Sequence, residues 1–153
     1  MFTVSSDKTK LQPRRMLELL QNTYWAKERT LEQMLLAAEH SVCFGAYLRE
    51  TGEQIGLLRV MTDFVTAFYI CDVVVDPGYR GLGVGKALME AAVSDSRYCH
   101  LRGLLVTSDA HGLYEKYGFT PANSRHMGRE PGISQMPDAK IPATQHLHSA
   151  LEP

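Results

Sequence analysis

The sequence has almost no net charge, no long apolar run and few cysteines, and each shortage excludes a class of protein. Sixteen Lys and Arg residues stand against seventeen Asp and Glu residues, which leaves a formal charge of -1 over 153 residues. This balance excludes the broad basic surface of a protein that binds nucleic acid or anionic lipid. There is no run of about 18 apolar residues that would predict a membrane span, and the N-terminal residues lack the apolar core of a secretory signal peptide. We therefore expect a cytoplasmic protein with no nucleic-acid partner and no membrane attachment.

The three cysteines are too few and too widely spaced for a disulfide scaffold or a zinc site. Cys43, Cys71 and Cys99 form no CxxC pair, and each lies in an apolar stretch, where a thiol behaves as a small hydrophobe. His146 and His148 lie close together but have no third ligand nearby. We expect reduced, structural thiols and no metal.

Hydrophobic periodicity changes along the chain and predicts an α/β fold of the α+β type with a mixed sheet. Thr30 and Gln33 form a capping-box pattern, although Thr30 could equally lie in the first turn of its helix. The apolar run over 68–75 is typical of a strand that is buried on both faces. The expected elements are a strand near 2–5, helices over 14–20 and 28–39, a hairpin over 41–62, a strand over 68–75, a helix from residue 84, a strand over 101–108 and a short helix over 109–118.

The C-terminal part of the chain loses this periodicity. Four prolines and two glycines fall between residues 124 and 153, and only a short stretch near 125–129 could form one more strand. We expect one domain over 1–125 and a loop-rich segment over 126–153.

The most informative stretch is a glycine-rich segment, residues 76–86, between the strand over 68–75 and the helix from Val84. Glycine permits close backbone approach, and the first N–H groups of a helix have no partner within the helix. Together with Arg80 and Lys86 they predict a site for a phosphate or pyrophosphate group. A purely structural glycine turn is the alternative.

The usual nucleotide motifs do not fit this segment. The Walker pattern fails because Ala87 follows Lys86, where that pattern has Ser or Thr. The dinucleotide pattern fails because the glycines at 81, 83 and 85 are spaced two by two. A nucleotide-phosphate binder of another fold is therefore disfavoured.

Two blocks of the sequence resemble the GNAT N-acetyltransferase superfamily. Arg80, Gly83 and Gly85 fill the positions of its acetyl-CoA loop signature, (Gln/Arg)-x-x-Gly-x-(Gly/Ala). Residues 107–119, TSDAHGLYEKYGF, are similar to its later motif N-x-x-A-x-x-L-Y-x-K-x-G-F, with Thr107 where Asn is frequent. The resemblance covers about residues 3–120 and implies a mostly antiparallel central sheet, flanked by helices, with a splayed slot for the cofactor.

The resemblance implies transfer of an acetyl group from acetyl-CoA to a primary amine of a small molecule or peptide, by direct attack in a ternary complex. The pyrophosphate would bind the glycine-rich segment, and the pantetheine arm would add to the central strand as a pseudo-strand. A homodimer is common among small domains of this kind. The implied cofactor-binding residues are Val73, Val74, Val75, Arg80, Gly81, Leu82, Gly83, Val84, Gly85, Lys86, Thr107, Tyr114 and Lys116.

Two residues are candidates for catalysis. Tyr114 matches the family tyrosine beside the sulfur and would act as general acid toward the departing thiolate; its alternative is a packing role. Asp72 is a carboxylate in an apolar strand, where burial should raise its pKa and suit it to act as a base or to anchor an ammonium group. It could instead bond a neighbouring loop, and a relay of waters could replace a dedicated base. The family position of Val73 makes its N–H the candidate oxyanion donor.

The acceptor pocket is expected beside the first two helices. Tyr24 and Trp25 would wall it with aromatic faces that suit a cationic or aromatic amine, although Trp25 could instead fill the core. Asp63 and Asp72 are further candidates for acceptor binding, and Phe64 and Tyr69 are candidates to line the pocket. A catalytically silent acyl-CoA-binding module is the alternative function, and the presence of Tyr114 and Asp72 favours an enzyme.

Overall fold

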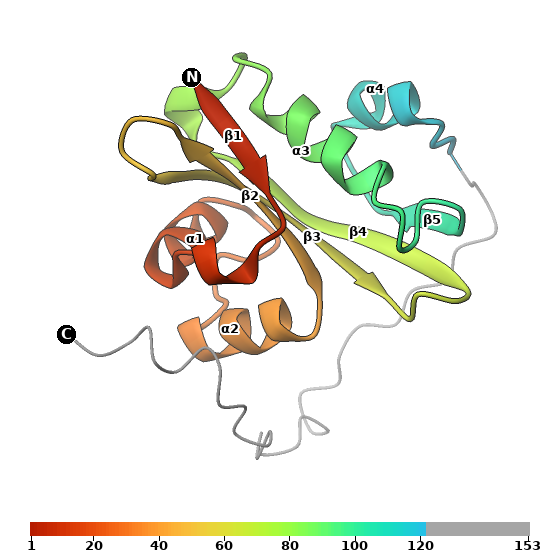
Figure 1. The fold of residues 1–153 in the computed structure, drawn as a ribbon, viewed down its shortest axis with the longest axis horizontal. Coiled ribbons are helices and arrows are strands. Elements are labelled where there is room, and N and C mark those ends of the chain that lie inside the picture. The colour runs from red at the N-terminus through yellow and green to blue at the C-terminus, as the bar shows by residue number, and fades with distance from the viewer. Residues whose placement is uncertain (122–153) are drawn as a thin grey trace. The chain divides into compact units, whose positions relative to one another are not determined.

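The computed structural model describes residues 1–121, which contain a five-stranded sheet with helices on both faces (Figure 1). Met1–Phe119 form one compact unit. The strands are β1 (Phe2–Ser5), β2 (Val42–Leu48), β3 (Gln54–Thr62), β4 (Ala67–Val75) and β5 (Arg102–Leu105). The helices are α1 (Pro13–Gln21), α2 (Leu31–Glu39), α3 (Val84–Val93) and α4 (His111–Tyr114), with 3-10 turns at Lys8–Lys10, Pro77–Tyr79 and Glu115–Tyr117.

The strands follow one another across the sheet in the order of the sequence. Neighbours run antiparallel from β1 to β4, and only β4 and β5 run parallel. The expected α/β class with a mixed, mostly antiparallel sheet is therefore confirmed. The expected strand near 125–129 and the segment over 126–153 lie outside the described residues.

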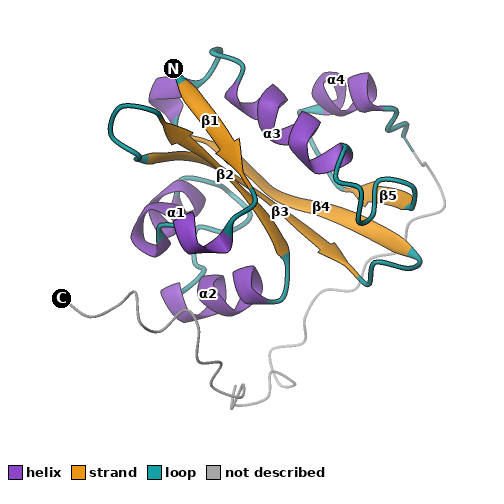
Figure 2. Ribbon diagram, in the orientation of Figure 1, coloured by secondary structure: helices purple, strands orange, loops and turns teal. Residues whose placement is uncertain are grey.

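The core lies between the sheet and its helices. Figure 2 shows α1 and α2 on one face of the sheet and α3 with α4 on the other. Helix α3 packs tightly on Gly56 of β3, where a Cβ atom would lie 3.1 Å from Leu88 Cδ1. A side chain at position 56 would therefore push α3 away from the sheet. No helix among residues 1–121 has the length and apolar character to cross a membrane.

Three expected elements differ in detail. Thr30 is the N-cap of α2 and forms the capping box with Gln33, so this helix begins at residue 31 and not at 28. The strand expected over 101–108 is shorter and is not buried, because β5 pairs only with β4 among the described strands. In β4, buried residues alternate with half-buried ones, so this strand is not buried on both faces as expected.

Strand β4 carries two irregularities that open the sheet. It pairs with β5 only from Ala67 to Ile70, so its second half has no neighbour on that side among the described residues. Leu57 pairs with Val74 and Arg59 with Cys71, which leaves a β-bulge at residues 72–73. Asp72 in this bulge has a φ of 50°. Bulges of this kind re-aim side chains and end pairing, and the expected splay between two strands is therefore present.

Candidate active site

A cavity of about 980 Å³ lies along the open half of β4. Its walls come from the segment between α1 and α2, from β3 and β4, from the glycine-rich segment with the start of α3, and from the β5–α4 segment with α4. Within residues 1–121, no group of three or more His, Cys, Asp or Glu side chains is placed to hold a metal ion.

The glycine-rich segment presents the N-terminus of α3 to this cavity. Gly81 and Gly83 have φ values of 77° and 83°, a left-handed conformation that L side chains rarely adopt. Gly83 is the N-cap of α3, and Gly83, Val84 and Gly85 all line the cavity. The unpartnered N–H groups of the first turn and the positive end of the helix dipole favour an anion here.

The base of this segment is fixed by Asp76. Its Oδ1 accepts a hydrogen bond from Gly78 N at 2.7 Å, and its Oδ2 pairs with Arg15 of α1. Asp76 N also donates to Ile55 O at 2.9 Å. These contacts connect the segment to α1 and β3 and hold its backbone in one position.

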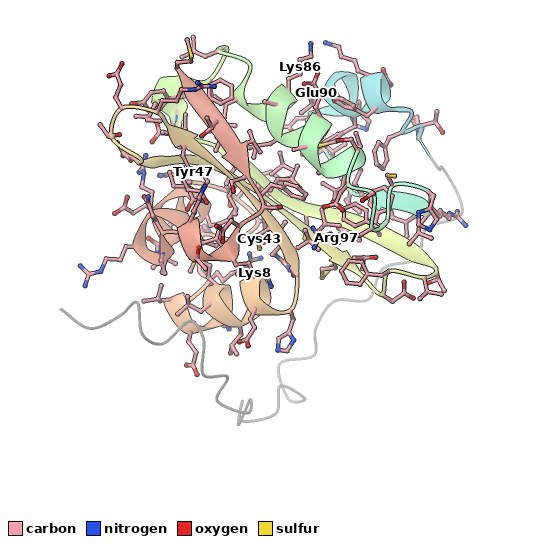
Figure 3. The ribbon with its side chains drawn as sticks, in the orientation of Figure 1. Lys8, Cys43, Tyr47, Lys86, Glu90 and Arg97 are labelled. Atoms are coloured by element: carbon pink, nitrogen blue, oxygen red, sulfur yellow. The ribbon has the colours of Figure 1, made fainter. Side chains whose placement is uncertain are left out.

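Two cations line the cavity beside the start of α3. Arg80 Nε donates to Val75 O at 3.3 Å. Lys86 Nζ lies 3.7 Å from Glu90 Oε1 on the exposed surface of α3 (Figure 3). Exposed pairs of this kind contribute little to stability, so Lys86 can turn toward a phosphate group at small cost.

Tyr114 of α4 brings a neutral hydroxyl to the cavity. The side chain is half-buried, and its ring lies edge-on to Phe119 with 6.4 Å between centroids. Its hydroxyl makes no hydrogen bond with another described residue. Burial raises the pKa of Tyr114, and the nearby Asp109 and Tyr24 raise it further. The hydroxyl therefore stays protonated over the usual pH range and can donate to an atom in the cavity.

Asp72 is an ion-paired carboxylate, and its expected raised pKa is not found. Its side chain is 4% exposed, and Oδ2 accepts from Arg29 Nη1 at 2.6 Å and from Arg59 Nε at 2.8 Å. Burial is the largest influence and acts to raise the pKa of Asp72, but the two arginines together outweigh it and leave the pKa below its ordinary value. A carboxylate held ionised in this way is a weak base.

The two arginines are cavity-lining residues that the sequence analysis did not identify. Arg59 also donates from Nη1 to Ser41 Oγ at 2.9 Å. One signal was available for Arg59, since it is a charged residue within the apolar strand β3, as Asp72 is within β4. Arg29 precedes α2 in an irregular segment and carried no such signal.

The aromatic pair lies at the cavity and not in the core. Tyr24 and Trp25 are 68% and 46% exposed, and their rings meet edge to face at 5.0 Å between centroids. The Tyr24 hydroxyl lies 2.9 Å from Ser108 Oγ, which connects the α1–α2 segment to the β5–α4 segment. Thr107, in the same region, accepts from Ala110 N at 3.0 Å, so its hydroxyl supports the start of α4.

Most of the predicted site residues lie in one place. Leu82 and Lys116 do not line the cavity, and both are exposed. Asp63 lies in the β3–β4 turn, where its carboxylate accepts from Val65 N and Thr66 N at 2.9 and 2.8 Å. The predicted residues that line the cavity are Tyr24, Trp25, Asp72, Val73, Val74, Val75, Arg80, Gly81, Gly83, Val84, Gly85, Lys86, Thr107 and Tyr114.

The three thiols should react at very different rates. Burial raises the pKa of Cys43 and of Cys71 to about 11, whereas Cys99 is exposed. Because the thiolate is the reactive form, we expect iodoacetamide at pH 8 to alkylate Cys99 at least about tenfold faster than the other two thiols. Peptide mapping by mass spectrometry over a time course measures the three rates. Alkylation of Cys71 as fast as that of Cys99 would contradict the burial described here.

Comparison with known proteins agrees with this arrangement. Residues 32–121 match the family model described as an acetyltransferase (GNAT) domain. A crystal structure of a protein from Xanthomonas campestris pv. campestris, assigned to the GNAT family, is 38% identical and superposes with a TM-score of 0.79 over 89% of this chain and 98% of that chain.

Two curated relatives match shorter segments. A protein of Glycine max named histone acetyltransferase TAP1 is 36% identical over 89 residues, which are 56% of this chain and 38% of that protein. A glucosamine 6-phosphate N-acetyltransferase of Trypanosoma brucei brucei is 44% identical over 61 residues, which are 39% of this chain and 41% of that protein. The matches thus span about two fifths of the length of these two relatives. The family model covers the parts of the cavity that come from β3, β4, the glycine-rich segment and α4, and not the segment between α1 and α2. It matches more than half of the chain, and the chain belongs to the GNAT acetyltransferase family.

Proposed function

We propose that the protein transfers the acetyl group of acetyl-CoA to a primary amine. The observation that carries this proposal is the convergence of three features on one cavity: the open half of β4, the N-terminus of α3 and the Tyr114 hydroxyl. The first offers main-chain groups, the second binds phosphate and the third donates a proton. The two curated relatives are named for different acceptors, a histone and a sugar phosphate, so they support the acetyl transfer but do not identify the amine.

The proposed cofactor contacts follow the cavity wall. The pyrophosphate binds the backbone from Arg80 to Lys86, where Leu82 contributes only main-chain atoms. The pantetheine arm lies along Val73–Val75 and pairs main chain to main chain, as a peptide does when it adds to a sheet edge. Thr107 and Tyr114 close the other side. Because Lys116 lies outside the cavity, it is the weakest of the proposed cofactor contacts.

Each proton transfer in the proposed reaction needs a donor and an acceptor. An aliphatic ammonium group has a pKa near 10.4, so it must lose a proton before its nitrogen attacks the thioester carbon. Since Asp72 is held ionised by two arginines, we assign this proton to cavity water that exchanges with solvent, and not to Asp72. The N–H of Val73 stabilises the oxyanion that forms. The C–S bond then breaks, and Tyr114 donates its proton to the departing thiolate. The attacking nitrogen loses its second proton to cavity water, and Tyr114 takes a proton back from that water.

The deciding experiment measures cofactor binding and turnover separately. We expect acetyl-CoA to bind in calorimetry, and free thiol to be released in a colorimetric assay only when a suitable amine is present, with the acetylated amine identified by mass spectrometry. Tight acetyl-CoA binding without thiol release for any acceptor would favour the silent acyl-CoA-binding module. Binding of ATP but not of CoA would overturn the proposal.

A further inference from the structure

The acceptor end of the cavity carries more positive than negative charge. Arg29 and Arg59 both contact a single oxygen of Asp72, so one carboxylate faces two guanidinium groups. Asp109 also lines the cavity, but among the described residues the only carboxylate that pairs with Arg29 or Arg59 is that of Asp72. The cations Arg80 and Lys86 lie at the other end, at the start of α3. One positive charge beside Asp72 is therefore left without a partner within the described residues.

The two arginines also keep hydrogen-bond donors free. A guanidinium group has five N–H donors, and Asp72 occupies only Nη1 of Arg29 and Nε of Arg59. Ser41 occupies Nη1 of Arg59. The remaining nitrogens, Arg29 Nε and Nη2 and Arg59 Nη2, have no partner among the described residues. The side chains of Arg29 and Arg59 are only 22% and 12% exposed, so these donors are largely shielded from bulk water. Away from bulk water, a hydrogen bond to a charged oxygen is stronger.

We propose that the amine acceptor carries a carboxylate or phosphate group, and that Arg29 and Arg59 bind this group. The inference rests on the proposed acetyl transfer and adds the class of acceptor to it. Asp72 then serves as a positioning residue, because it holds two guanidinium groups side by side, which would otherwise repel each other. An anion from the acceptor supplies the second negative charge that this cluster lacks.

The neighbouring side chains are consistent with a small anionic acceptor. Tyr24 and Trp25 line the same cavity and offer apolar faces to the body of the acceptor between its amine and its anion. A polycationic acceptor is disfavoured, since its additional ammonium groups would meet the unpaired guanidinium charge.

Arg29→Gln is the test variant, because Arg59 also bonds to Ser41 and is more deeply buried. We compare acceptors in matched pairs, an amino acid against its amide and an amino-sugar phosphate against the amino sugar, so that carboxylate and phosphate are distinguished. We expect the wild type to prefer the anionic member of one pair by at least tenfold in kcat/KM. Arg29→Gln should raise the KM for that acceptor about tenfold to a hundredfold, with kcat and the KM for acetyl-CoA changed less than twofold.

Arg49→Gln is the matched control. Arg49 is exposed and lies outside the cavity. Within residues 1–121 its hydrogen bonds go to Phe2 O, at 3.4 Å from Nε, and to Met1 O from its backbone N–H. Its variant should leave every KM unchanged. Equal KM values for the two members of both pairs in the wild type, or an equal loss for neutral and anionic acceptors in Arg29→Gln, would overturn the proposal.

Direct binding separates this proposal from the proposed reaction. Calorimetry with the same compounds and the CoA-bound protein measures anion recognition without turnover. Binding of an anionic compound by the wild type, and its loss in Arg29→Gln, would support the anion site at Arg29 and Arg59. If the same compounds bind but no acceptor is acetylated, only the proposed acetyl transfer is contradicted. Absence of binding by every anionic compound in the wild type would overturn the anion site even if neutral amines are acetylated.

Discussion

Asp72→Asn is expected to lower the free energy of unfolding by about 3 kcal/mol, the usual cost of removing one partner from a buried ion pair. The substitution leaves Arg29 and Arg59 facing each other without the carboxylate that both contact. Asparagine tolerates the left-handed conformation at this position almost as well as aspartate, so the variant changes the charge without adding backbone strain. Urea denaturation at pH 7 measures the loss.

The effect of this substitution should depend on pH in a defined direction. The pKa of Asp72 is lower in the folded protein than in the unfolded chain, where it is about 3.9. The contribution of its carboxylate to the free energy of unfolding is therefore complete above about pH 3.9 and is lost as the pH falls through the lower pKa of the folded state. Wild type and variant should therefore differ at pH 5 to 7 and converge in strong acid. Asp109→Asn, an exposed change with no hydrogen bond to lose among the described residues, is the control. A loss below about 1 kcal/mol for Asp72→Asn would show that the pair is not a buried one.

Tyr114→Phe is expected to lower kcat about a hundredfold, the lower end of what a general acid contributes. The ring and its contact with Phe119 remain, so the Kd for acetyl-CoA should change less than twofold. Because the pKa of Tyr114 is raised, loss of its proton should not lower the wild-type rate at any pH below the ordinary tyrosine pKa of about 10. Steady-state kinetics over pH 6 to 10, with calorimetry for acetyl-CoA, test both statements.

Tyr47→Phe is the matched control for this experiment. Tyr47 is buried in β2, and its hydroxyl has no hydrogen-bond partner in the part of the chain that the structure describes, so removing that oxygen should leave kcat unchanged. An unchanged kcat in Tyr114→Phe as well would remove Tyr114 from its proposed role and assign the thiolate's proton to water.

The elements and the glycine-rich segment could be predicted because their signals are local. The capping box at Thr30 and the change of period after α2 both appear within a few neighbouring residues. The predicted phosphate site at the start of α3 needs only a strand, several glycines and a helix start in succession, and the structure has them in that order. Side-chain placement within a motif was less predictable: Lys116 fits the second motif, but it lies in a 3-10 turn, is exposed and does not line the cavity.

The charge cluster could not be predicted because it depends on three distant segments and one bulge. Burial alone led to the expectation of a raised pKa for Asp72. The two arginines that reverse this shift reach Asp72 from β3 and from the segment before α2, and no sequence pattern relates Arg29 to either strand. The positive φ of Asp72 is also invisible in the sequence, because the apolar run over 68–75 continues through the bulge.

The segment of residues 22–30 has a consequence for engineering. It carries Tyr24, Trp25 and Arg29 and lies between two helices that both pack on the sheet. Among residues 1–121, two side-chain hydrogen bonds connect it to the rest of the site, Tyr24 to Ser108 and Arg29 to Asp72. Loops of this kind can be exchanged while the scaffold remains. A graft that alters acceptor choice must therefore return a cation to Asp72 and a hydrogen-bonding side chain to Ser108, whereas position 25 can vary.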